Sequence, residues 1–173
     1  MKKIFISLIA ACAVMAGCQK TGPDLFLGNY SFKSGGYVEI SGKVKPSRES
    51  DVPRDTSFIR HLSNESGQMH IVKGTDGRLK VTMNIIGGTP VVFDATASSD
   101  AITLAPVNRQ MIVYPDLTTL GQDIAMMLTV EGVGHRFQNT IIFEMNVKGS
   151  YDTFRVEGEI SKTFVNCIAT ENE

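Results

Sequence analysis

The stretch Leu79-Lys80-Val81-Thr82-Met83-Asn84-Ile85 alternates apolar and polar side chains without a break. Successive side chains of an extended strand point to opposite faces, so this period of two gathers the apolar residues on one face and the polar residues on the other. The stretch therefore predicts a β-strand with one face against a core and the other face in water.

The same alternation continues in both directions from residues 79–85 and predicts about ten short strands. Eleven segments carry the pattern, by residue number 27–33, 37–44, 68–73, 79–85, 91–96, 101–105, 110–114, 124–131, 141–148, 153–161 and 164–168. Short turns separate most of them, which makes sequential strands antiparallel neighbours. The predicted fold class is all-β, an antiparallel up-and-down meander of about 8–10 strands. A barrel and a two-sheet β-sandwich both fit the alternation, and the barrel is favoured because closure leaves no exposed sheet edge.

Several segments interrupt the alternation. Residues 46–67 are polar and are predicted to form a long loop, in which Asp55-Thr56-Ser57 would cap a short helix. Residues 115–122 are predicted to be irregular with one helical turn, and residues 132–138 to be a loop. Gly35-Gly36 is predicted to turn the chain between two strands.

The N-terminus has the layout of an export signal. Lys2 and Lys3 precede the apolar run 4–14, which is shorter than the roughly 20 residues that a membrane-spanning helix needs. Small residues and Cys18 follow this run. We therefore divide the chain into a signal peptide that is removed (1–17), a lipidated N-terminus and tether (18–25) and a single β-barrel domain (26–170).

Met15-Ala16-Gly17-Cys18 resembles the lipobox of bacterial lipoproteins, with Met15 where that family prefers leucine. The resemblance implies that Cys18 is the site of lipid attachment. Two or more acyl chains would then hold the protein on a membrane without a transmembrane helix. Gln19, in place of an aspartate, implies the outer membrane of a Gram-negative cell envelope, and the choice of leaflet stays open.

Length, charge and cysteine content limit the kinds of domain, partner and site that the chain can have. Without residues 1–17 the chain keeps 173 − 17 = 156 residues, enough for one domain with a core. Its formal charge becomes 15 − 18 = −3, since Lys2 and Lys3 are lost from 17 bases and 18 acids. The chain has no basic run, so nucleic acid is not an expected partner. Cys12 leaves with the signal, and Cys167 is predicted to be a small buried hydrophobe rather than a nucleophile.

Gly28-Asn29-Tyr30, at the start of the first strand, together with the meander, resembles the lipocalins and the wider calycin group, although the chain has no tryptophan. The resemblance implies a lipocalin-like barrel in which Tyr30 plugs the closed end. It also implies a basic side chain that covers this aromatic ring, for which Arg155 on a late strand is the candidate.

The inward faces of the predicted strands collect methionine and phenylalanine. These candidate ligand-lining residues are Met83, Phe93, Met126, Phe143, Met145 and Phe154. They fit either an ordinary core or an apolar pocket. The leading expectation is a non-enzymatic protein that binds a small apolar ligand in or at the mouth of the barrel. The alternative is an interaction domain that binds a protein or a glycan through loops 46–67 and 115–123.

Catalytic and metal-binding patterns are weak. His61, His70 and His135 lie too far apart in sequence to present two imidazoles to one metal from a single element. Glu157 and Glu159 share one strand face, where charged side chains are usually solvated. We therefore expect that the protein binds no metal and no cofactor and that it is not an enzyme. A hydrolase would require one of the histidines to meet a carboxylate or Cys167 in a cleft.

Overall fold

The computed structural model describes residues 21–46, 52–115, 123–153 and 155–172, whose strands form one antiparallel sheet. Two short 3-10 helices are η1 (Gly22–Phe26) and η2 (Thr75–Gly77). The strands are β1 (Gly28–Val44), β2 (Arg54–Lys73), β3 (Leu79–Ile85), β4 (Val91–Ala97), β5 (Ala101–Pro115), β6 (Ile124–Phe137), β7 (Thr140–Lys148), β8 (Ser150–Asp152) and β9 (Val156–Glu171). Within these ranges, no helix is long and apolar enough to cross a membrane.

The sheet closes on itself. Its strands are neighbours in the order β1-β2-β3-β4-β5-β6-β7-β9-β8, and β9 also pairs with β1. Hydrogen bonds therefore run around a ring of 8 strands, and β8 extends the sheet beside β9. The predicted all-β antiparallel meander and its closure into a barrel are confirmed, whereas the chain does not form the alternative sandwich.

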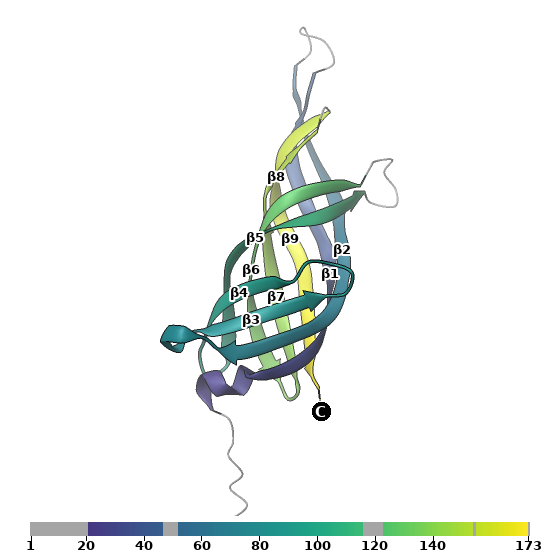
Figure 1. The fold of residues 1–173 in the computed structure, drawn as a ribbon. Coiled ribbons are helices and arrows are strands. Elements are labelled where there is room, and N and C mark those ends of the chain that lie inside the picture. Colours follow the sequence, from purple (N-terminus) through teal and green to yellow (C-terminus); the bar gives the residue numbers. More distant parts are fainter. Residues whose placement is uncertain (1–20, 47–51, 116–122, 154, 173) are drawn as a thin grey trace, which may run out of the picture.

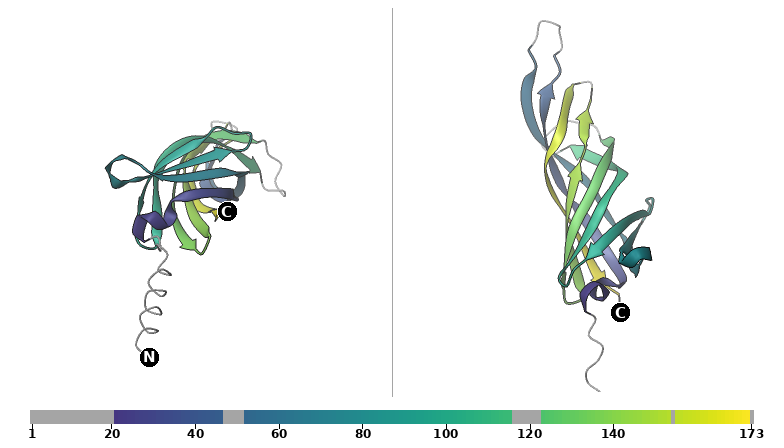
Figure 2. Two further views of the ribbon diagram at one scale, coloured as in Figure 1. Left: turned by 60° about the horizontal axis from the view of Figure 1, so that its bottom comes forward. Right: turned by 90° about the vertical axis from the view of Figure 1, so that its left-hand side faces the viewer.

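The barrel is irregular along its length. β2 and β5 pair directly at Arg60–Leu62 and Val113–Pro115, so the β3–β4 hairpin completes the wall only toward one end. That end carries η1 and the C-terminus and is called the closed end below (Figure 1). At the opposite end, called the hairpin end, β1, β2, β8 and β9 extend beyond the rest of the barrel, as the right-hand view of Figure 2 shows.

The predicted turn at Gly35-Gly36 is wrong, because β1 runs unbroken through both residues. The pairing of β1 with β2 shifts register here, between Ser34 and Gly36. Gly36 has φ of 150°, and a Cβ on it would lie 2.1 Å from the carbonyl oxygen of Phe164 on β9. The two glycines therefore let one long strand bend closely against its neighbour, a common role of glycine within strands.

Two predicted loops are largely strand. Residues 54–67 belong to β2, and Asp55 and Thr56 pair with Lys43 and Gly42 of β1 instead of capping a helix. Residues 132–137 belong to β6, and only Gln138 and Asn139 turn the chain into β7. The cross-strand hydrogen bonds of a partner strand outweigh the local preference of these polar residues for turns. Residues 47–51 and 116–122, within the other predicted irregular segments, lie outside the described ranges.

Irregularities in register change which side chains enter the barrel. β2 gains an extra residue between Leu62 and Glu65, and β5 gains one between Leu104 and Val107. Each extra residue reverses the alternation that follows it, since a shift by one residue turns every later side chain to the other face. As a result, Glu65 and Arg109 line the interior.

The barrel interior is a continuous apolar core. Five of the six candidate ligand-lining residues are buried in it: Met83, Phe93, Met126, Phe143 and Met145. Phe154 lies outside the described residues. Phe26 of η1 and Tyr30 of β1 are fully buried. Side chains thus fill the barrel from wall to wall and hold the strands that carry the sites described below.

Candidate functional site

Three places combine polar groups with burial or with open space: the closed end, the interior and a groove on the outer wall.

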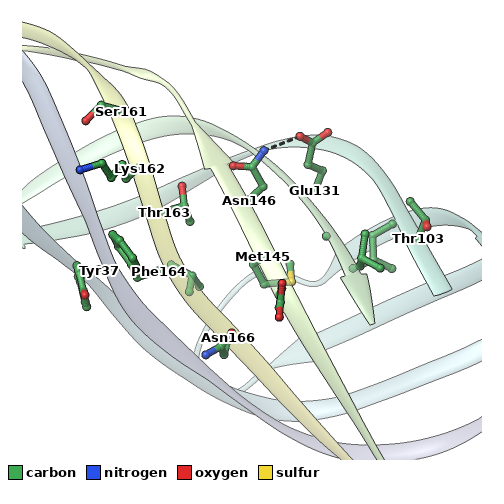
Figure 3. Close-up of a pocket in the computed structure, with 15 residues that line it drawn as sticks. Tyr37, Thr103, Glu131, Met145, Asn146, Ser161, Lys162, Thr163, Phe164 and Asn166 are labelled. Carbon is green, nitrogen blue, oxygen red and sulfur yellow. Dashed lines mark hydrogen bonds between the residues drawn. The ribbon is translucent and has the colours of Figure 1, made fainter. Parts of the chain in front are cut away.

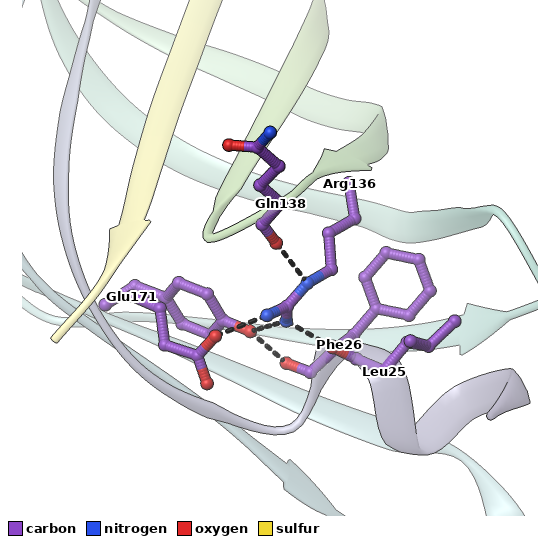
Figure 4. A network of polar contacts seen from close by, with 6 residues as sticks. Leu25, Phe26, Arg136, Gln138 and Glu171 are labelled. Carbon is purple, nitrogen blue, oxygen red and sulfur yellow. Dashed lines mark hydrogen bonds and ion pairs between the residues drawn. The ribbon is translucent and has the colours of Figure 1, made fainter. Parts of the chain in front are cut away.

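At the closed end, the Tyr30 hydroxyl donates a hydrogen bond to the carbonyl oxygen of Phe26, 2.9 Å away. Arg136, at the end of β6, donates from Nη1 to the Tyr30 hydroxyl at 2.9 Å and from Nε to the carbonyl of Gln138 at 2.8 Å. The guanidinium also contacts the carbonyl of Leu25 and the Glu171 carboxylate, so it joins four segments of the chain (Figure 4).

The basic partner of Tyr30 is therefore Arg136 and not Arg155, which the sequence analysis had assigned to this role. Arg155 is exposed and precedes β9 at the hairpin end, where its carbonyl accepts a hydrogen bond from the Lys45 amide. The sequence analysis missed Arg136 because it placed residues 132–138 in a loop. Burial raises the pKa of the Tyr30 hydroxyl above its ordinary value, and the nearby Arg136 cation partly offsets this effect. The closed end is thus plugged by buried rings and by the hydrogen bonds of Arg136.

The interior holds one buried ion pair. Arg109 of β5 donates to both carboxylate oxygens of Glu65 on β2, at 2.5 and 3.0 Å, and the two side chains are 14% and 10% exposed. Beside the pair lies a cavity of about 20 Å³, which Met83, Phe93 and Met145 also line. A water molecule needs roughly 10–15 Å³ of such volume. The cavity has room for about one water molecule and none for an organic ligand.

Cys167 and Arg60 are the other reactive or charged groups inside. Cys167 is 1% exposed, and burial, with a contribution from the Glu65 carboxylate, raises the pKa of its thiol to about 12. Such a thiol is protonated at neutral pH and is a poor nucleophile. The Arg60 guanidinium carbon lies 4.8 and 5.7 Å from the ring centres of Phe58 and Tyr151, and its Nη2 is 3.3 Å from the Tyr151 hydroxyl.

A groove of about 850 Å³ lies on the outer wall and is called the outer groove below. It crosses five neighbouring strands. Across the wall it is lined by Tyr37 of β1, residues 161–166 of β9, residues 144–146 of β7, residues 131–133 of β6 and residues 103–104 of β5. Figure 3 shows aromatic side chains toward one end of the groove and hydrogen-bonding side chains toward the other.

The aromatic end is a stacked pair. Tyr37 and Phe164 are cross-strand neighbours on β1 and β9, with ring centres 4.7 Å apart and an interplanar angle of 23°. His61 of β2 flanks Tyr37 on its other side, with ring centres 6.0 Å apart. Phe164 is 48% exposed although it is large and apolar. Cross-strand pairing holds these rings in register, so Phe164 presents an exposed aromatic surface that is supported from behind by Tyr37.

At the polar end, side chains are fixed by their own hydrogen bonds. Asn146 donates to the Glu131 carboxylate at 2.8 Å, and Lys148 donates to the same oxygen at 2.7 Å. Nearer the aromatic pair, Lys162 donates to Glu39 at 2.9 Å. These bonds lower the pKa of the Glu131 and Glu39 carboxyls, so both groups are ionised at neutral pH.

Thr163 closes the floor of the groove where β7 and β9 stop pairing. The register of these strands runs from Thr140↔Thr170 to Met145↔Val165 and goes no further. Beyond it, the Thr163 hydroxyl accepts a hydrogen bond from the Val147 amide at 3.2 Å and donates one to the Val147 carbonyl at 2.9 Å. The side chain thus replaces the missing ladder bonds and satisfies both backbone groups of Val147.

The three histidines do not meet one another or Cys167. His70 contacts Asn29 at 2.7 Å on the outer face, His61 lies beside Tyr37, and His135 is exposed near the closed end. In the part of the chain that the structure describes, no group of three or more histidine, cysteine, aspartate or glutamate side chains could hold a metal ion. Cys18, the candidate for lipid attachment, lies outside that part.

The outer groove was not foreseen from the sequence. Phe164 lies within a predicted strand. Its partner Tyr37 is 164 − 37 = 127 residues earlier in the chain, and only the pairing of β1 with β9 brings the two rings together. Comparisons with known proteins give no guide to the site. No protein-family model, no curated protein and no solved structure matches the chain.

Proposed function

We propose that the protein is a non-enzymatic, lipid-anchored binding domain of the bacterial cell envelope, and that it binds its ligand in the outer groove. The contrast in available space carries this proposal: about 850 Å³ outside the wall against about 20 Å³ inside it. Ligand sites usually measure a few hundred Å³ or more and combine aromatic side chains with a few fixed polar groups. The groove has both features. It supports an interaction domain, as in the alternative from the sequence, but on the strands of the outer wall rather than on loops 46–67 and 115–123.

The expectation of an apolar ligand inside the barrel stays a prediction. It would require Met83, Phe93 and Met145 to move apart, because they now fill the space around the interior cavity. Methionine side chains adapt to irregular shapes, so such a movement is conceivable physically but costs the packing of the core.

The lipocalin-like resemblance is part of the proposal. Its support is local: Gly28-Asn29-Tyr30 starts β1, Tyr30 is fully buried at the closed end, and the guanidinium of Arg136 lies on its hydroxyl. A barrel plugged in this way leaves its outer wall and hairpin end as the surfaces that vary with function.

Lipid attachment at Cys18 gives the domain a defined orientation. Thr21, next to η1, is three residues after Cys18, so an extended chain separates them by at most about 10 Å. The closed end would then stand just off the membrane, proposed to be the outer membrane. The hairpin end would point away from the membrane, and the outer groove would lie on the side wall between the two ends. Labelling with a fatty-acid probe tests the anchor: the label should appear on the wild type and be absent from Cys18→Ala.

Binding assays with groove variants test the proposed site. Purified full chain in detergent should bind members of an array of glycans and peptides, and Phe164→Ala should remove this binding. Ile168→Ala is the matched control, because Ile168 is an equally exposed apolar residue on the same strand at 48%. Binding that survives Phe164→Ala, or one-to-one binding of an apolar fluorescent probe such as diphenylhexatriene in its place, would contradict the proposal.

A further inference from the structure

We infer that the ligand of the outer groove is a linear, uncharged glycan that lies across the strands. This inference rests on the proposed function and adds the chemical class and the orientation of the ligand. It draws on four features of the groove: its aromatic platform, its neutral hydrogen-bonding groups, its charge balance and the absence of a free strand edge along its floor.

The aromatic platform fits the flat face of a sugar ring. The faces of Tyr37 and Phe164 are electron-rich, and they attract the weakly positive C–H groups that line one face of many pyranoses. Because the two rings are nearly parallel and only 4.7 Å apart, Tyr37 packs on one face of Phe164 and holds that ring in place, so the opposite face of Phe164 is the one on which a sugar would stack. The stack needs no rearrangement on binding, which keeps the entropic cost of association low.

The polar part of the lining fits the hydroxyl groups of a glycan. Thr103, Asn146 and Asn166 line the groove and are exposed. Asparagine and threonine side chains both donate and accept hydrogen bonds, as sugar hydroxyls do. A glycan can therefore satisfy these groups in more than one way along its length.

The charge balance excludes an anionic ligand. The charged lining residues are Glu131, Glu144 and Lys162, with a formal sum of 1 − 2 = −1. Lys162 is paired with Glu39, so the lining offers no unpaired cation to a phosphate or carboxylate. Anionic polymers and anionic lipid headgroups are bound mainly through such cations. An uncharged ligand meets no repulsion here.

The floor of the groove does not favour an extended peptide. A peptide that adds to a sheet needs a strand edge with unpaired backbone groups. Within the described residues, β9 and β7 pair with each other up to Met145 and Val165. Past that point Thr163 occupies both backbone groups of Val147. No backbone ladder is therefore open along the groove at this place.

The groove also sets a minimum length for the ligand. From Tyr37 on β1 through β9, β7 and β6 to Thr103 on β5 there are four strand spacings. At roughly 4.8 Å each, this distance is about 19 Å, the span of a short oligosaccharide rather than of a single sugar. Affinity should therefore increase with glycan length until the groove is covered.

Calorimetry with purified full chain tests this inference. The probes are uncharged homo-oligosaccharides of hexose and of N-acetylhexosamine, in α- and β-linked series of increasing length, and a lysine-rich peptide. We expect one neutral series to bind with an affinity that increases with length. Phe164→Ala should weaken this binding by about tenfold or more, since it removes the exposed ring on which the sugar would stack.

Asn166→Ala should also weaken glycan binding, whereas Ile168→Ala and Asn84→Ala, exposed residues of matched type away from the groove, should not. If only the peptide binds and Phe164→Ala abolishes that binding, the glycan inference is wrong while the groove remains the binding site. If binding of every probe is absent or unaffected by Phe164→Ala, both the inference and the proposed function are wrong.

Discussion

The interior of the barrel and the outer groove use the same kinds of side chain in opposite ways. Each region has phenylalanine, a tyrosine and an ion pair. In the interior these groups are shielded from water, as in Phe93, Tyr30 and the Glu65–Arg109 pair. In the groove they are half exposed, as in Phe164, Tyr37 and the Glu39–Lys162 pair.

This difference indicates a division of labour between the two faces of one wall. Burial makes each interior contact important for stability, because removed atoms leave cavities or unpaired charges. Because the groove side chains are exposed, replacing one of them should change the free energy of unfolding little, and each remains available to contact a ligand. Matched substitutions in the two regions can therefore separate folding from recognition.

The largest contrast should come from phenylalanine. Phe93→Ala opens a cavity in a core position that is 1% exposed, and should lower the free energy of unfolding by about 3–5 kcal/mol. Phe164→Ala removes one exposed stacking partner and should lower it by about 1 kcal/mol. Urea unfolding followed by circular dichroism measures both. Equal losses for the two variants would contradict the division between interior and groove.

The ion pairs should give the next largest contrast. Arg109→Met leaves Glu65 buried without its partner and should lower the free energy of unfolding by about 3 kcal/mol. Lys162→Met removes an exposed cation and should change it by less than about 1 kcal/mol.

A double variant separates the value of the interior pair from the cost of breaking it. Glu65→Leu combined with Arg109→Met removes both charges, so its unfolding free energy should recover most of the loss seen for Arg109→Met alone. A double variant as unstable as the single one would mean that the pair contributes through packing rather than charge.

The tyrosines give a smaller contrast. Tyr30→Phe keeps the ring but leaves the Phe26 carbonyl and one Arg136 N–H without their partner, and should lower the unfolding free energy by about 1–3 kcal/mol. Tyr37→Phe keeps the stacked ring on the outer face and should change it by less than about 0.5 kcal/mol. Thermal unfolding of the two variants provides the measurement. A larger loss for Tyr37→Phe would show that the groove is part of the folding core.

The interior was easier to predict from the sequence than the groove. Strict alternation, as in residues 79–85 and 141–148, identified strands and their buried faces, so Met83, Phe143 and Met145 were correctly placed inward. Burial of a strand face is a local pattern, repeated every second residue. Its prediction needs no knowledge of which strands pair.

Prediction failed where the pairing of strands that are distant in sequence determines the structure. The register irregularities in β2 and β5 turn Glu65 and Arg109 inward, and no local pattern marks them in advance. Residues 54–67 have the polar composition of a loop, yet they become strand because β1 offers them a partner. The Tyr37–Phe164 platform depends on closure of the ring between β1 and β9, which the alternation permits but does not require.

Cys167 gives the last and smallest contrast between two chains, and it reports on the interior alone. The pKa of its thiol is about 12 in the folded chain, against an ordinary value of 9.0 for an exposed thiol. Between these two values the unfolded chain loses the thiol proton while the folded chain keeps it, so the unfolded state binds fewer protons and stability falls as pH rises. This contribution is complete below about pH 9 and is lost progressively toward pH 12.

From pH 8 to pH 10 the wild type should therefore lose about 1 kcal/mol more unfolding free energy than Cys167→Ala. Comparing the two chains cancels the titration of lysine and tyrosine, which they share. Identical pH profiles would mean that water reaches Cys167, and the interior would then be more open than its cavity of about 20 Å³ indicates.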